Sequence, residues 1–289
     1  LTKRASAVVM ICLSLAELKY IMFYSANPTV SQPITPTLNS FLTSNFGLSR
    51  RTFLTIHNNG EGVAGNFNAF VVPSLLNAAD VNVIAVDWSQ ASFLYTVGLA
   101  NAPQAGELIA EIINVLITNF GYNANMVTIV GVGLGGHIAG ITSRYIDGNV
   151  AQIVALDPSL HGWTHHPDIL TPNDAQVVEV LHTTRGRTGF DLPLGTIDFY
   201  PNNGEFQNGC GTDVSCSHIF SYVFYAESLN AEGTDGNQFV GTACDSYEEA
   251  IAMTCSGARD AVFGGTAVKT SESGIYIFRT NAAQPFAQG

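Results

Sequence analysis

Short apolar runs alternate along this chain with longer stretches whose apolar residues recur every three or four positions. The short runs are typical of buried strands and the longer stretches of amphipathic helices. This alternation predicts an α/β fold, with a mostly parallel central sheet and helices on both faces. The expected strands are 20–24, 52–56, 81–87, 126–130, 153–156, 177–182, 196–200 and 275–278, and the expected helices are 66–77, 102–120, 136–146 and 218–228.

The segments between these elements are short and rich in proline and glycine. We expect irregular connections at 25–39, 157–172 and 201–217. The length of 289 residues would allow two domains, but no repeat, charge run or low-complexity stretch divides the chain. We therefore expect one domain over 1–289, in which the last 45 or so residues form the closing edge.

The charge balance excludes one class of partner. The chain has 11 Lys+Arg against 23 Asp+Glu, a net charge of −12, which opposes binding to nucleic acid. No uncharged apolar run reaches 18 residues, so no membrane span is expected. The apolar run 5–15 after Lys3 and Arg4 looks like part of a signal peptide, but the chain starts at Leu1. We interpret it as a mature protein that has lost its targeting segment.

Four of the five cysteines fall into two close pairs. The grouping predicts two small disulfide loops, Cys210 to Cys216 and Cys244 to Cys255, and hence an oxidising compartment and a secreted protein. The alternative is a set of buried thiols in a cytosolic protein. Cys12 lies in an apolar run and is expected to be a core thiol.

A glycine-rich turn, G-V-G-L-G-G over 131–136, follows one predicted strand and precedes a predicted helix. This is the context of a nucleophile elbow, G-x-S-x-G, but Gly133 stands at the serine position. Such a turn could instead cradle a phosphate at a helix N-terminus. No Lys-Ser or Lys-Thr follows, which excludes a P-loop, and the spacing differs from that of a dinucleotide site.

Several segments around this turn resemble the animal pancreatic-lipase family, which includes triglyceride lipases, phospholipases A1 and insect yolk proteins. The resemblance implies an α/β-hydrolase fold and covers the catalytic domain only, without a C-terminal β-sandwich domain. The matching segments are TIH at 55–57, VIAVDWS at 83–89, the turn itself, IVALDP at 153–158, VEVLHT at 178–183, IDFYPN at 197–202 and CSHIFSY at 216–222.

Carried over by position, the resemblance makes Asp157 the triad acid, His218 the triad base and Gly133 the site of the nucleophile. Asn59 and Leu134 match the positions that donate the oxyanion hydrogen bonds. Because Gly133 has no hydroxyl, and because H-N-N-G at 57–60 replaces the usual H-G-apolar sequence, we expect a chain that is not an enzyme. We also expect Gly133→Ser to destabilise the fold by about 1 kcal/mol without restoring lipase activity.

Asp157 and His218 have two interpretations. They can form a buried hydrogen bond that ties two loops together, which we favour, or a residual base that acts on water. By analogy, the old acyl cleft is expected to be lined by Asn59, Trp88, Leu134, Leu160, Trp163 and His218. The pair Cys210 and Cys216 resembles the cysteines that bracket the family's lid, with only 211–215 between them, as in the phospholipase A1 branch.

We expect no metal and no cofactor. The segment 161–168 holds His161, His165, His166 and Asp168, but its spacing shows no helical pattern, so a solvated loop is expected rather than a zinc site. Some family members hold calcium near the segment resembling 171–174, where Thr171 stands in place of a carboxylate. His57, His137 and His182 recur in the family motifs and are expected to be structural.

The resemblance leads to three functional hypotheses. The first is a secreted, catalytically inactive lipase homologue that serves as a yolk or nutrient storage protein. The second is a carrier that holds a fatty acid, sterol or pigment in the cleft, and the third is a weak lipid or ester hydrolase without a serine nucleophile. The partners to be considered are an apolar small molecule, an uptake receptor and a second copy of the chain.

Overall fold

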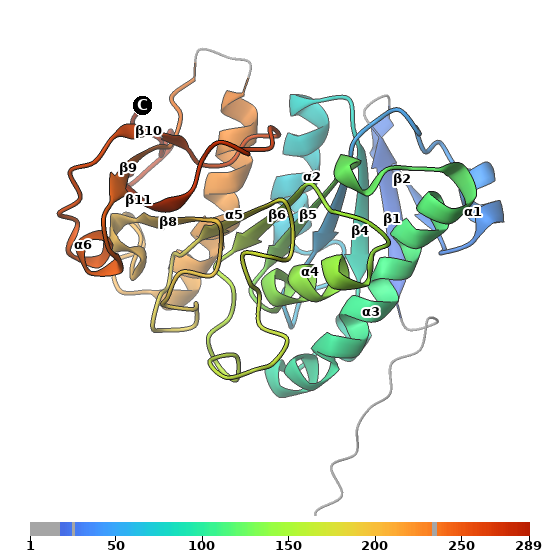
Figure 1. The fold of residues 1–289 in the computed structure, drawn as a ribbon, viewed down its shortest axis with the longest axis horizontal. Coiled ribbons are helices and arrows are strands. Elements are labelled where there is room, and N and C mark those ends of the chain that lie inside the picture. The colour runs from blue at the N-terminus through green and yellow to red at the C-terminus, as the bar shows by residue number, and fades with distance from the viewer. Residues whose placement is uncertain (1–17, 25–26, 233–235) are drawn as a thin grey trace, which may run out of the picture.

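The structure, a computed structural model, describes residues 18–24, 27–232 and 236–289. These residues form one eleven-stranded sheet in the order β10-β9-β11-β8-β7-β6-β5-β3-β4-β1-β2 (Figure 1). Cys12 and the apolar run 5–15 lie outside the described residues. The strands are β1 (Lys19–Tyr24), β2 (Asn27–Ile34), β3 (Thr52–Ile56), β4 (Asn82–Asp87), β5 (Val127–Val132), β6 (Gln152–Leu156), β7 (Val177–Leu181), β8 (Ile197–Pro201), β9 (Val240–Cys244), β10 (Arg259–Val262) and β11 (Gly274–Phe278).

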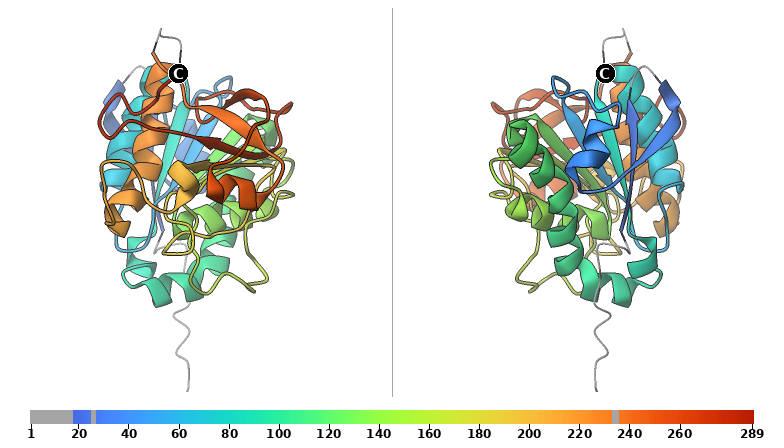
Figure 2. Two further views of the ribbon diagram at one scale, coloured as in Figure 1. Left: turned by 90° about the vertical axis from the view of Figure 1, so that its left-hand side faces the viewer. Right: turned by 90° about the vertical axis from the view of Figure 1, so that its right-hand side faces the viewer.

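The run of strands from β11 to β4 is parallel, and two antiparallel strands extend it at each edge. Helices α2 (Asn66–Ala78) and α5 (Val214–Ala231) cover one face, and α3 (Tyr95–Phe120) and α4 (Leu134–Tyr145) cover the other (Figure 2). Side chains alternate between the two faces, so that Phe53 packs against α2 and α5 while Leu54 packs on the opposite side. The predicted fold class is therefore confirmed.

The segment 25–39 is more regular than predicted. Residues 27–34 form β2, which pairs with β1 at the edge of the sheet, and α1 (Leu38–Leu42) follows. The prolines of this segment suggested a loop, yet an edge strand tolerates proline because only one side of it takes part in the ladder. At the opposite edge, β9, β10 and the short helix α6 (Tyr247–Ala252) were also not predicted.

Helix α3 begins at Tyr95 rather than at Ala102, although Gly98 and Pro103 lie within it. A Cβ atom on Gly98 would stand 2.8 Å from Leu134 Cδ1, so glycine allows α3 to approach the start of α4. Gly98 is therefore a packing feature of this helix. The early start brings Tyr95 to the carboxyl edge of the sheet, where the candidate site lies.

Both predicted disulfides are present, with Cα atoms 5.5 Å apart in Cys210–Cys216 and 4.6 Å apart in Cys244–Cys255. The first closes a short loop that runs into the first turn of α5, where Cys216 lies, and the second connects the end of β9 with the segment after α6. The alternative of free thiols does not apply to these four residues. In the described ranges no helix is long and apolar enough to cross a membrane.

Candidate active site

The turn at Gly133 connects the end of β5 to the start of α4 at the carboxyl edge of the parallel strands. Gly133 has φ 59° and ψ −119°, a conformation that is strained for residues other than glycine. Gly135 serves packing, because a Cβ atom there would stand 2.1 Å from the carbonyl oxygen of Ile56. The glycines thus fit a tight strand-to-helix turn against β3, and the amide of Leu134 bonds a side chain instead of facing an open phosphate cradle.

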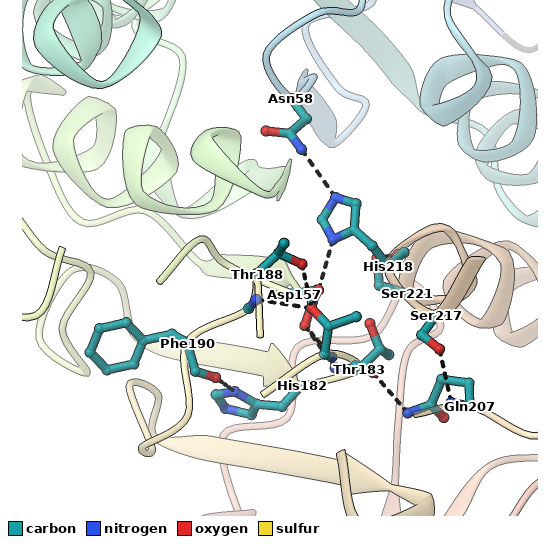
Figure 3. Close-up of polar contacts among 12 residues, drawn as sticks. Asn58, Asp157, His182, Thr183, Thr188, Phe190, Gln207, Ser217, His218 and Ser221 are labelled. Atoms are coloured by element: carbon teal, nitrogen blue, oxygen red, sulfur yellow. Dashed lines mark hydrogen bonds and ion pairs between the residues drawn. The ribbon is translucent and has the colours of Figure 1, made fainter. Parts of the chain in front are cut away.

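Asp157 follows the end of β6 and is almost completely buried. Its carboxylate accepts hydrogen bonds from the backbone N–H groups of Thr183 and Thr184, both at 2.8 Å, from the Thr184 hydroxyl, and from Nδ1 of His218 at 2.7 Å (Figure 3). Burial alone raises the pKa of this carboxyl, but the bonds from His218, Thr184 and Thr183 outweigh burial and hold the pKa below its usual range.

His218 lies in the first turns of α5, and its ring stands between Asp157 and Asn58 (Figure 3). Its Nδ1–H donates to the Asp157 carboxylate, which leaves Nε2 as an acceptor in the neutral ring. Nε2 accepts a hydrogen bond of 3.1 Å from Nδ2 of Asn58. The structure therefore brings Asp157 and His218 together, with the ring in the tautomer that a general base needs.

The Asn58 side chain occupies the centre of the site. Its Oδ1 accepts from the backbone N–H groups of Asn59 at 2.9 Å and Leu134 at 3.0 Å, the two groups that the sequence assigned to the oxyanion positions. A Cβ atom added to Gly133 would stand 2.3 Å from Asn58 Cγ. The Asn58 carboxamide thus fills the space that a side chain at 133 would need.

Sequence reasoning did not select Asn58, although a signal was available. By the resemblance, Asn58 corresponds to the glycine of the family's H-G sequence and Gly133 to the serine of the elbow. On this correspondence a larger side chain stands at one position and a smaller one at the other, and the fold brings the two positions into contact. The exchange is visible in the sequence only once the contact between the two loops is known.

A cavity of about 490 Å³ opens beside Asn58 and His218. Val214 and Ser215, from the disulfide loop and the start of α5, form part of its wall. Of the lining residues expected from the sequence, Asn59 and His218 border it. The other residues that line it are Asn58, Glu61, Asn66, Tyr95, Val132, Ser159, His161, Thr188, Val214, Ser215, Ile219 and Tyr222.

Trp88, Leu134, Leu160 and Trp163 do not line this cavity, which corrects the prediction. Trp88 is fully buried and donates through Nε1 to the carbonyl oxygen of His57 at 2.9 Å. Trp163 stacks on His137 with ring centroids 4.0 Å apart, and Leu134 is buried beneath the turn. Leu160 packs at the margin of the same core. Trp88, Leu134 and Trp163 point into the protein because they pack in the hydrophobic core, and Leu160 is partly buried against it.

The three histidines expected to be structural are fully buried and hydrogen-bonded. His137 Nε2–H donates to the carbonyl oxygen of Ser159 at 2.7 Å, and burial lowers the pKa of His137 to about 3. His57 Nδ1 donates to the carbonyl oxygen of Asn58, which helps to fix the loop that carries that residue. His182 bonds Asp198 and the carbonyl oxygen of Phe190.

The segment 161–168 brings His166 and Asp168 within 4.0 Å of each other, but not the other two histidines with them. His161 borders the cavity, while His166 packs on Trp163 with ring centroids 4.5 Å apart. In the described part of the chain no three His, Cys, Asp or Glu side chains are grouped closely enough to hold a metal ion.

An arginine binds the segment 171–174. Arg144 donates through Nε and Nη2 to both carboxylate oxygens of Asp174, at 2.8 and 2.7 Å, and through Nη2 to the carbonyl oxygen of Ile169. Thr171 donates to the same carboxylate from its backbone and its hydroxyl. A cationic side chain thus satisfies Asp174, which is 8% exposed.

We expect Arg144→Met to lower the free energy of unfolding by about 2 kcal/mol, because it leaves the buried Asp174 carboxylate without its counter-charge and Arg144 is itself only partly buried. Urea unfolding at neutral pH measures the difference. Arg187→Met is the matched control, since Arg187 pairs with Glu205 at the surface and should change stability by less than about 1 kcal/mol. Equal losses in the two variants would contradict the assignment.

The features of the site define a class of protein. A mostly parallel sheet carries a strand–turn–helix elbow after β5, an acid after β6 and a histidine on α5, in the chain order of α/β hydrolases. The family model described as Lipase matches residues 13–286. The chain therefore belongs to the lipase family.

Curated relatives agree with this family assignment. The chain is 30% identical over 265 residues to "Pancreatic triacylglycerol lipase" of Myocastor coypus, covering 82% of this chain and 57% of the relative. It is 32% identical over 242 residues to "Pancreatic lipase-related protein 2" of Cavia porcellus, covering 80% and 55%. The chain thus spans little more than half the length of these relatives.

A likeness to a solved structure was also found. An alpha/beta hydrolase enzyme from a Medee basin deep-sea metagenome library is 15% identical, with a TM-score of 0.36 over 55% of this chain and 65% of that one.

The comparisons contradict the prediction that this chain is not an enzyme. The matching family model is that of lipases, and the relatives that match most of the chain are named as a triacylglycerol lipase and a lipase-related protein. The prediction rested on the absence of a hydroxyl at Gly133 and on the changed loop 57–60, which concern the serine route alone; the third hypothesis, a hydrolase without a serine nucleophile, does not depend on them. Membership of the lipase family replaces that prediction.

Proposed function

We propose that the chain binds a lipid in the cavity beside Asn58 and His218. The observation that carries the proposal is the cavity itself, because about 490 Å³ lies within the range of roughly 300–1,000 Å³ that small-molecule sites occupy. Its wall combines apolar side chains such as Val132, Val214 and Ile219 with a few polar groups. Such a wall suits an acyl chain, and a sterol or a pigment is the alternative occupant.

Displacement of a fluorescent fatty alcohol, which carries no charge, from the purified chain tests lipid binding. Ile219→Glu places a charge at the partly exposed edge of the cavity and should weaken binding about tenfold or more. Leu42→Glu is the matched control, because Leu42 is an exposed side chain of α1 that does not line the cavity. If the wild-type chain does not bind the probe, or if both variants weaken binding equally, the proposal is wrong.

A second candidate function is hydrolysis of a lipid ester by water, which the orientation of His218 by Asp157 favours. His218 Nε2 would take a proton from water while the water oxygen bonds the ester carbonyl carbon. The ester C–O bond would then break, and the leaving alkoxide would take the proton from His218. Nε2 must first be released by Asn58. The names of the relatives agree with this activity.

Release of fatty acid from a short-chain triacylglycerol tests hydrolysis. His218→Gln should reduce the rate to the background of the uncatalysed reaction, because the amide cannot act as a base. His165→Gln is the control, since His165 lies outside the cavity lining and should retain the wild-type rate. A rate that His218→Gln leaves unchanged would exclude this route.

Secretion and a nutrient-storage role remain predictions. Two disulfides are typical of proteins from oxidising compartments, which supports secretion. Storage in yolk has the support of the resemblance alone, as do an uptake receptor and a self-assembled oligomer. Native mass spectrometry of material from the natural source would show whether the chain carries a small molecule and whether it forms oligomers.

A further inference from the structure

The hydrogen-bonding capacity of the Asn58 amide is almost, but not completely, used. Oδ1 accepts from two backbone N–H groups, which occupy both of its lone pairs. Nδ2 has two hydrogens, and one of them is donated to His218. Within the part of the chain that the structure describes, the second has no acceptor. Because Asn58 borders the cavity, this amide has one free donor at the cavity wall.

Three polar groups that border the cavity with Asn58 are already engaged. His218 Nε2 accepts from Asn58, the Tyr95 hydroxyl donates to the carbonyl oxygen of His161 at 2.6 Å, and the Thr188 hydroxyl bonds Thr184. A ligand with an acceptor oxygen can therefore bond the second Nδ2 hydrogen of Asn58 while every hydrogen bond that Asn58 makes to the protein stays in place.

The charges of the wall favour a neutral acceptor over an anion. Among the described residues that line the cavity, Glu61 is the one carboxylate, and none is a lysine or an arginine. The buried carboxylate of Asp157 lies directly behind His218. A fatty-acid carboxylate would therefore meet negative charge without a cation to pair with, whereas a carbonyl group carries no net charge.

We infer that Asn58 recognises the head of the ligand, and that the ligand is a neutral lipid with one acyl chain and a carbonyl oxygen that accepts from Asn58 Nδ2. This inference rests on the proposed lipid binding and narrows its ligand class. Asn58 keeps its bonds to Asn59, Leu134 and His218 while it donates the remaining hydrogen to the carbonyl. The cavity volume agrees with one acyl chain rather than the three of a triacylglycerol.

Three ligands of similar chain length test the inference by displacement of the fluorescent fatty alcohol. 2-Undecanone presents a carbonyl that cannot be hydrolysed, decanoate presents an anion, and undecane presents no acceptor. The wild-type chain should prefer the ketone to undecane by about three- to tenfold, the value of one hydrogen bond, and should bind decanoate more weakly than the ketone at pH 8.

Asn58→Asp removes the donor with little change of shape and should abolish the preference for the ketone over undecane. Asn66→Asp is the matched control, because it adds the same charge to the wall of the same cavity and should keep that preference. If Asn58→Asp does not fold, the side-chain amide signals of Asn58 in the wild-type 15N spectrum supply the test. The ketone should shift one of the two protons, and undecane should shift neither.

The outcomes separate the two claims. If none of the three ligands displaces the probe, lipid binding itself fails. If all three bind alike, or if Asn58→Asp keeps the preference for the ketone, lipid binding stands and the role of Asn58 is wrong. Stronger binding of decanoate than of the ketone at pH 8 would overturn the neutral ligand class.

Discussion

A serine installed at position 133 should react with a fluorophosphonate only when Asn58 is replaced by glycine in the same molecule. In Gly133→Ser alone, the new Cβ atom would stand 2.3 Å from Asn58 Cγ, and the residue would keep a φ of 59°. We expect a loss of about 3 kcal/mol, from backbone strain and overpacking together, rather than the 1 kcal/mol expected from strain alone. Denaturant unfolding measures this loss.

The double variant Asn58→Gly, Gly133→Ser removes the overlap. It also frees the N–H groups of Asn59 and Leu134 to bind an oxyanion, and it leaves His218 Nε2 free to accept from the serine hydroxyl. Labelling by the fluorophosphonate, followed by mass spectrometry, should therefore be at least about a hundredfold faster than in the single variant.

Two controls accompany the double variant. Asn58→Gly alone has no hydroxyl at 133 and should not label, and adding His218→Gln to the double variant should suppress labelling. Equal labelling of Gly133→Ser with and without the change at Asn58 would show that Asn58 does not block the site.

Asp157→Asn should lower the free energy of unfolding by about 3 kcal/mol at pH 7, because it removes a buried charge that several donors surround. Asparagine keeps the shape of the side chain and tolerates the φ of 47° at this position. The effect should therefore come from the lost charge and its hydrogen bonds rather than from backbone strain.

The difference in the free energy of unfolding between wild type and Asp157→Asn should become smaller as the pH falls. The pKa of Asp157 is lowered in the folded state, so its contribution is fully present above the unfolded pKa of about 3.9 and is lost as the pH falls through the folded value. Urea unfolding at pH 7 and in steps below pH 4 measures the change. Asp80→Asn, at an exposed carboxylate, is the control and should alter stability little. If the stability difference between wild type and Asp157→Asn instead grew in acid, the lowered pKa of Asp157 would be wrong.

The central strands could be predicted because the side-chain pattern that specifies each of them lies within the strand's own sequence. Residues 52–56, T-F-L-T-I, consist of apolar and β-branched side chains, and β3 has the same bounds, since such side chains suit a strand that is buried on both faces. Strand β2 was missed because its prolines are tolerated only at the edge of a sheet, and position within the sheet is not a local property. The start of α3 was missed for a similar reason. Gly98 leaves room for the side chain of Leu134, which is a contact between distant parts of the sequence.

The candidate site divides in the same way. Gly133, Asp157 and His218 could be selected from motifs, because each directly follows a strand or lies in the first turns of a helix in a recognisable sequence. The cavity wall could not, since Trp88 and Trp163 turn inwards to the core for reasons that involve distant partners. Asn58 acts on a residue 76 positions away, and only the fold reveals that distance as a contact.

Asn58 Oδ1 accepts hydrogen bonds from the backbone N–H groups of Asn59 and Leu134. The side chain therefore competes, from within the molecule, with any carbonyl compound in solution for these two N–H groups. A group attached by a short tether has an effective concentration of about millimolar or more, which dilution does not change. Solutes at micromolar concentration therefore leave these two N–H groups occupied by Asn58. Small carbonyl compounds should not accumulate there, and the specificity of the cavity is set by groups that remain free at every ligand concentration.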